Sequence, residues 1–88
     1  MKVKKDYITR QVAGEYLLIP VGEAARNTRG LINLTESGYL LFQKLQNDCT
    51  EEDLVNALLE EYDASQAQVE QDVRAFLAQM RRLDMLEE

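Results

Sequence analysis

The strongest constraint on the fold is a run of three helical patterns in the second half of the chain, each opened by a residue that can cap a helix. The capping residues are Thr35, Thr50 and Ser65, whose hydroxyl oxygens can accept a hydrogen bond from the backbone of the first turn. Asp53 follows Thr50 in the spacing of a capping box. Apolar residues then recur at helical spacing, so the sequence predicts helices over about 36–46, over about 51–62, and from after Ser65 to about 83.

The first third of the chain favours strands instead. Residues 7–12 are rich in β-favouring side chains, Gly14-Glu15 supplies turn residues, and residues 16–19 form a short apolar run. These features predict a hairpin. The polar, Gly-bounded segment 22–30 is interpreted as a connection, and a third short strand is expected around residues 31–34.

The resulting order of elements is β-β-β-α-α-α, which predicts an α+β protein with a three-stranded antiparallel sheet followed by three helices. We expect one domain spanning residues 1–88, in which the sheet buries one face against the helices. In the third strand, alternation places Leu31 and Asn33 on one face and Ile32 and Leu34 on the other. The sequence leaves open which of these faces is buried.

The charge of the chain is unevenly distributed. The net charge is -6, and residues 34–88 hold thirteen Asp or Glu against four Lys or Arg, whereas residues 1–33 hold three against six. Binding to nucleic acid phosphates needs clustered Lys and Arg, so the acidic helical part disfavours that class of partner. The mildly basic first third could attract an acidic partner.

The residue types that most often carry catalysis and metal binding are scarce. The chain has no His, no Gly-rich loop and one Cys, Cys49, which can form neither an internal disulfide nor the usual zinc site. We therefore expect no metal and no cofactor. Neither a membrane span nor a signal-peptide pattern is present, so the cytoplasm is the expected location and no membrane partner is expected.

Several short strings resemble one family, and their spacing fits that family as well. They are Leu34-Thr35-Glu36-Ser37-Gly38, Thr50-Glu51-Glu52-Asp53-Leu54, Glu61-Tyr62-Asp63, Asp72-Val73 with Phe76-Leu77, and Met85-Leu86. Together they resemble the family of coenzyme PQQ synthesis protein D (PqqD), the recognition element for ribosomally made, modified peptides. The chain departs from the family pattern at Thr35, Gln46-Asn47 and Asp84, where the family usually has Asn, Asp-Gly and Gly.

The resemblance implies a winged helix-turn-helix fold that binds the leader region of a precursor peptide. In such proteins the peptide adds as an extra strand beside the third strand, lies against the third helix, and is presented to a modifying enzyme, commonly a radical S-adenosylmethionine (SAM) enzyme. The domain itself does no chemistry. PQQ assembly is one of several pathways that the resemblance allows.

Residues of the third strand and the third helix are the candidate peptide-binding site. An exposed edge strand offers unpaired backbone groups to an extended peptide, and adjoining pockets select its side chains. The candidates on the strand are Arg29, Gly30, Leu31, Ile32 and Asn33, and those on the helix are Val69, Asp72, Val73, Phe76 and Met80. Every apolar residue among the helix candidates could instead serve the core, which a chain this short needs. Asp72 could fix its own helix rather than contact a peptide.

Arg26, Arg29 and Arg74 could orient an acidic leader peptide, or could be solvated surface residues. The stretch Asn33 to Gly38 is expected to have a chiefly architectural role, which is to hold the third strand in position against the helices. It ends the edge strand and begins the first helix.

Three other functions compete with peptide binding. A DNA-binding winged helix shares the fold and would use Arg74, Arg81 and Arg82, but Glu70 and Asp72 occupy the helix turns that usually read bases. An enzyme would need a nucleophile and base pair, which the sequence does not offer. A structural subunit of a larger enzyme stays open, and the exposed edge could also pair with a second copy to form a homodimer.

Overall fold

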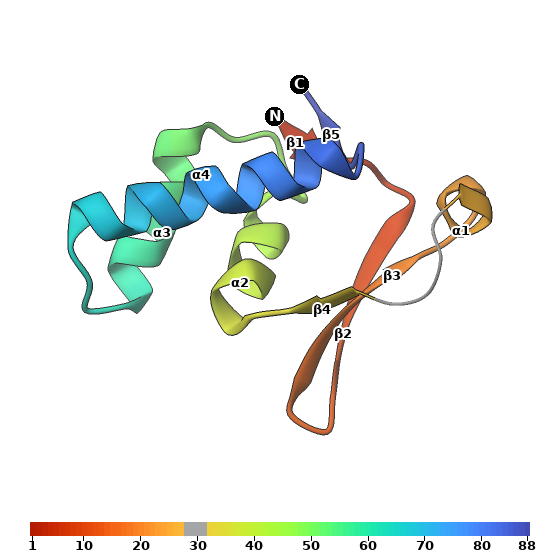
Figure 1. Ribbon diagram of the computed structural model, residues 1–88, viewed down its shortest axis with the longest axis horizontal. Helices are drawn as coiled ribbons and strands as arrows, with labels where there is room; N and C mark the ends of the chain where they lie inside the picture. Colours follow the sequence, from red (N-terminus) through yellow and green to blue (C-terminus); the bar gives the residue numbers. More distant parts are fainter. Residues whose placement is uncertain (28–31) are drawn as a thin grey trace.

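The computed structural model describes residues 1–27 and 32–88, and its elements follow the predicted order with three additions (Figure 1). The strands are β1 Lys2–Val3, β2 Tyr7–Val12, β3 Glu15–Pro20, β4 Ile32–Leu34 and β5 Leu86–Glu87. The helices are α1 Glu23–Asn27, α2 Glu36–Lys44, α3 Glu51–Glu61 and α4 Gln66–Arg82. The predicted α+β architecture, a three-stranded antiparallel sheet followed by three helices, is confirmed.

The three-stranded sheet has the order β2-β3-β4, with β3 in the centre and both pairings antiparallel. The predicted hairpin is confirmed, but its turn lies one residue earlier than expected. Val12 pairs with Glu15, so Ala13 and Gly14 form the turn, with φ of 51° and 81°. A two-residue hairpin turn of this kind needs positive φ at both central positions, which Gly14 adopts more easily than Ala13.

Three elements, α1, β1 and β5, were not predicted at the level of secondary structure. Segment 22–30 is not wholly a connection, because α1 lies within it and buries Ala24 against the core. Strands β1 and β5 pair antiparallel, with Val3 opposite Leu86. Elements of two or five residues are too short to show a periodic pattern in the sequence, which is why the sequence analysis missed them.

The caps of the three main helices are confirmed. Thr35 Oγ1 accepts from the backbone N–H of Gly38 at 3.0 Å, and Ser65 Oγ accepts from that of Gln68 at 3.2 Å. Thr50 and Asp53 form a full capping box, with distances of 3.1 and 2.9 Å. These bonds satisfy donors that a helix start leaves unpaired.

Helix α4 ends in a Schellman motif centred on Asp84. The backbone N–H of Met85 donates to Met80 O at 3.0 Å, and that of Asp84 donates to Arg81 O at 3.0 Å. Asp84 itself has a φ of 55°, in the region that glycine adopts most readily. The family's preference for Gly at this position therefore has a physical reason, and Asp84 occupies the motif at some cost in backbone strain.

The core lies between the sheet and the layer formed by α2, α3 and α4. Its fully buried side chains include Leu18, Phe42, Leu45, Leu54, Val73, Leu77, Met80 and Met85. On β4, Ile32 and Leu34 pack against this core, whereas Asn33 is exposed. The structure thus decides the question that alternation left open, since the face with Ile32 and Leu34 is the buried one.

Candidate peptide-binding groove

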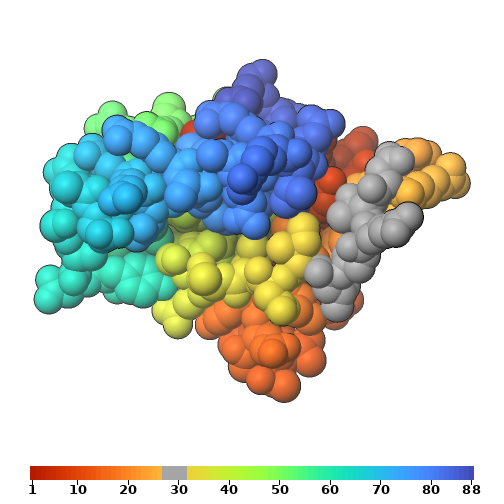
Figure 2. Space-filling view, viewed as in Figure 1, coloured from red at the N-terminus to blue at the C-terminus, as the bar shows by residue number. Residues whose placement is uncertain are grey.

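Strand β4 has a free edge within the described part of the chain. It pairs with β3 on one side, and no further strand follows it in the sheet order. Leu34, the last residue of β4, is followed directly by Thr35, the cap of α2. In Figure 2 this segment (yellow) reaches the surface between α4 (blue) and the β2–β3 hairpin (orange). The edge of the sheet therefore leads into the start of a helix.

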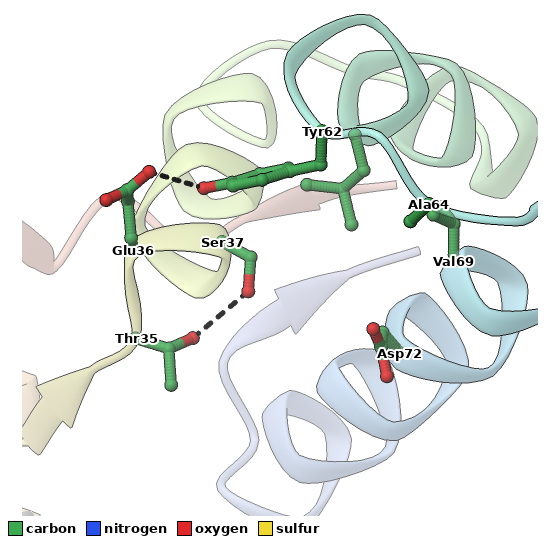
Figure 3. A pocket seen from close by; sticks show the side chains of 8 residues that line it. Thr35, Glu36, Ser37, Tyr62, Ala64, Val69 and Asp72 are labelled. Atoms are coloured by element: carbon green, nitrogen blue, oxygen red, sulfur yellow. Dashed lines mark hydrogen bonds between the residues drawn. The ribbon is translucent and has the colours of Figure 1, made fainter.

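Two adjoining cavities lie between the start of α2 and helix α4. One has a volume of about 400 Å³ and the other of about 330 Å³. Both are lined by Thr35, Ser37, Leu58 and Asp72, so we describe them together as the α2–α4 groove. Figure 3 shows the larger cavity, with Thr35, Glu36 and Ser37 on one side and Val69 and Asp72 of α4 on the other. The groove begins where β4 ends.

Gly38 sets the width of the groove at the smaller cavity. A Cβ atom at this position would lie 3.1 Å from Thr35 Oγ1 and 3.4 Å from Cε1 of Phe76. Glycine therefore lets the Phe76 ring approach the first turn of α2 while the Thr35 cap stays in place. Phe76 lines the cavity and is almost fully buried, so it forms a firm wall.

The far end of the groove is crossed by a side-chain hydrogen bond. Tyr62 Oη donates to Glu36 Oε1 at 2.8 Å and so connects the end of α3 to the start of α2 (Figure 3). The pKa of Tyr62 is raised to about 12, mainly by this bond to the carboxylate and secondly by burial. On the opposite wall, Gln68 Nε2 donates to Asp72 Oδ1 at 2.9 Å. The polar rim of the groove thus holds two carboxylates in fixed positions.

The candidate residues from the sequence fall into four groups. Val69, Asp72 and Phe76 line the groove. Val73 and Met80 have no exposed surface and lie in the core beneath it. On β4, Ile32 packs against the core, and Asn33 is exposed on the other face of the sheet. Arg29, Gly30 and Leu31 lie outside the described residues.

The sequence analysis did not select several residues of the groove wall. Thr35, Glu36 and Ser37 were interpreted as architectural, and Leu58 and Tyr62 as parts of a helical stripe, yet all five line the larger cavity. A cap and a helix exit carry no sign of a binding role in a sequence. What brings them together is the packing of α2 against α3 and of α3 against α4.

Of the arginines considered for ligand contact, Arg26 and Arg74 do not line the groove, and Arg29 lies outside the described residues. Arg74 lies near Glu51 of α3, with Nε 4.0 Å from the carboxylate, and Arg26 pairs with Glu23 in α1 at 3.5 Å. Arg81 binds Glu88 at 2.9 Å. Because α4 presents acidic residues in its first turns and engages two of its three arginines locally, its charge does not suit a DNA-reading helix.

Metal and thiol chemistry receive no support from the described side chains. Within residues 1–27 and 32–88, no three Cys, Asp or Glu side chains converge in a way that could hold a metal ion. Partial burial raises the pKa of the Cys49 thiol, which lowers the share of the reactive thiolate.

Comparison with known proteins agrees with the fold. The model of the family described as coenzyme PQQ synthesis protein D (PqqD) matches residues 15–86. The chain belongs to the PqqD family. The matched range includes β3, β4, the three main helices and every residue of the α2–α4 groove. A search among curated proteins gives no match.

Two solved structures share the fold of this PqqD-family chain. One is TbiB1 in complex with the TbiA(beta) leader peptide, with a TM-score of 0.76 and 23% identity over 99% of this chain and 95% of that one. The other is lasso peptide synthetase B1 complexed with its leader peptide, with a TM-score of 0.73 and 16% identity over 99% and 96%. Both structural matches cover 99% of this chain, so they extend beyond residues 15–86, the range of the family match.

In the described residues, no helix has the length and apolar character required to cross a bilayer.

Proposed function

We propose that this chain binds the leader region of a ribosomally made precursor peptide and presents it to a modifying enzyme. The observation that carries the proposal is the position of the free β4 edge, which leads directly into the α2–α4 groove. Membership of the PqqD family supports it, and so does the fold shared with two proteins whose structures contain leader peptides.

The physical mechanism is strand addition. An extended peptide beside β4 gains backbone hydrogen bonds from the edge, and alternate side chains of that peptide point toward the groove. Ile32 and Asn33 would meet the peptide mainly through their backbone, because Ile32 packs against the core and Asn33 points away from it. Val69, Asp72 and Phe76 would contact side chains of the peptide, while Val73 and Met80 would hold these groove residues in position from below. We also propose Arg29, Gly30 and Leu31 as peptide contacts.

In this scheme the chain supplies binding and orientation, and the reaction takes place on the partner enzyme. A radical SAM enzyme is the partner class that the family resemblance favours. We further propose that residues 1–88 act as one recognition unit, since the core joins side chains from β1 to β5. A second copy that paired along β4 would compete with the peptide, so light scattering with and without peptide would reveal this alternative.

The proposal is tested by titrating the isotope-labelled protein with the leader region of a candidate precursor peptide, sought among the short reading frames near its gene, and following the backbone amides by NMR. We expect shifts concentrated at residues 32–38 and at the groove residues of α4, with β1 and β5 unchanged. An unchanged spectrum at high peptide concentration, or shifts centred on β2, would overturn the proposal.

A further inference from the structure

We infer that the peptide segment held in the α2–α4 groove carries a basic residue, Lys or Arg, whose cationic group lies between Asp72 and Glu36. This inference rests on the proposed function and specifies the class of ligand that the groove takes. It differs from the expectation that arginines of this chain receive an acidic leader, because the described ones among them, Arg26 and Arg74, lie elsewhere.

The first argument is the charge of the groove lining. The two cavities are lined by two carboxylates, Asp72 and Glu36, and by no Lys or Arg among the described residues. The start of α2 contributes a partial positive charge of only about half a unit, which is less than either carboxylate. The helical part around the groove is acidic as well. A cationic side chain is therefore attracted, and an acidic one is repelled.

The second argument is that both carboxylates retain unused acceptor capacity. Gln68 donates to Oδ1 of Asp72, and Tyr62 donates to Oε1 of Glu36. An ionised carboxylate offers about four lone-pair positions on its two oxygens. The existing bonds thus orient the two groups and leave room for a donor from a ligand.

The third argument is the apolar part of the lining, which we call the apolar floor. Leu58 and Val69 line the larger cavity, and both are almost fully buried. Lys and Arg have long aliphatic stems that cover apolar surface while the charged end stays at the rim. An apolar floor with a carboxylate rim fits such a side chain better than a purely apolar or a purely polar one.

A display selection with random linear peptides tests the inference on the intact chain. Peptides are enriched on the immobilised wild-type protein, on Asp72→Asn, on Asp72→Lys and on Glu60→Gln. Glu60 is an exposed carboxylate of α3 outside the groove lining, so its variant makes the same change in net charge as Asp72→Asn. Thermal unfolding of each variant checks that the fold is intact.

We expect wild-type and Glu60→Gln selections to converge on peptides with Lys or Arg at one fixed position. The selected peptides should bind Asp72→Asn about tenfold more weakly, as for the loss of a hydrogen bond to a charged group. Asp72→Lys should instead select Asp or Glu at the same position.

Two results would overturn the inference, and they can be told apart. Enriched peptides that bind the groove without a fixed basic position would contradict the charge preference and leave the proposed function intact. A failure to enrich any peptide on the wild-type protein would contradict the proposed function itself, and the inference with it.

Discussion

The three-stranded sheet has two outer strands, β2 and β4, and they differ in what lies beside them. Strand β2 is six residues long and carries exposed Ile8 and Val12, so by length and composition it is the better template for another strand. Strand β4 has only three described residues, but it leads into a groove with an apolar floor and a carboxylate rim. Under the function we propose, the comparison teaches that free backbone groups need an adjoining groove to make a peptide site.

The surroundings of β2 are less suited to hold a side chain. The cavity near its start is smaller, about 240 Å³, and is lined largely by charged residues: Lys4, Asp6, Glu23 and Asp84. Lys4 and Asp84 pair there at 3.0 Å. Backbone bonds provide affinity on either edge, but pockets for side chains provide selectivity, and these favour β4.

The largest expected effect comes from removing the wall of the groove. Phe76→Ala should lower the free energy of unfolding by about 3 kcal/mol, because it empties an almost fully buried position. It should also weaken peptide binding by at least about tenfold through the lost groove contact. Chemical denaturation and calorimetric titration measure the two effects.

Val12→Ala is the matched control on the other edge. Val12 is 51% exposed at the end of β2, so its truncation should change stability by no more than about 0.5 kcal/mol and leave affinity unchanged. Equal losses of affinity in the two variants would show that the edges do not differ as we describe.

The next effect concerns the junction between β4 and α2. Thr35→Ala removes the cap bond to Gly38 and should cost about 1 kcal/mol of stability, which lowers the Tm by about 4–8 °C. Affinity should fall as well, since Thr35 lines both cavities. Thr50→Ala removes an equivalent cap away from the groove and should lower the Tm without changing affinity. If both variants bound peptide equally well, the first turn of α2 would have no part in the site.

A gain in stability is expected at the turn that joins β2 to β3. Ala13 has a φ of 51°, which is strained for a residue with a Cβ, whereas Asn tolerates this region and favours a tight hairpin before Gly14. Ala13→Asn should therefore raise the free energy of unfolding by about 1 kcal/mol. Peptide affinity should not change, because the turn lies outside the α2–α4 groove. A measured destabilisation would mean that the turn is built differently.

The smallest effect concerns the bond that crosses the far end of the groove. Ultraviolet difference titration should find one tyrosine, Tyr62, with a pKa of about 12, against its ordinary value of 10.0. The folded state holds this proton more tightly than the unfolded chain. The linked stability is therefore present below pH 10 and is lost as the pH rises through about 12.

Glu36→Gln should bring the pKa of Tyr62 back toward 10.0, because the carboxylate is the main cause of the shift. Ser37→Ala keeps Glu36 and serves as the control. An unaltered Tyr62 titration in Glu36→Gln would contradict the bond.

Local signals in the sequence were sufficient to predict most of the fold. Caps at Thr35, Thr50 and Ser65 placed the starts of the three main helices, and the apolar stripes placed their ends to within about two residues of the observed ones. Such signals depend on neighbours within a few positions of the chain. The β1–β5 pair joins residues more than eighty positions apart and has no such signal.

The site was predicted less completely, for the same physical reason. Val69, Asp72 and Phe76 could be proposed because they belong to one helix with a clear periodicity. Glu36 and Tyr62 meet only because α2 and α3 pack together. Val69 and Val73 are both buried on α4, and only Val69 lines the groove. A groove between helices is a property of tertiary contacts.

The most direct test of the account is to locate the peptide strand against the two edges of the sheet. Isotope-filtered NOE measurements on the labelled protein, with an unlabelled leader peptide that binds it, detect short distances between backbone protons of paired strands. We predict cross-strand NOEs from the peptide to Ile32, Asn33 and Leu34, and side-chain NOEs to Phe76 and Val69. Cross-strand NOEs to Tyr7–Val12 instead, or a bound peptide without any strand pairing, would contradict the assignment of β4 and its groove as the binding site.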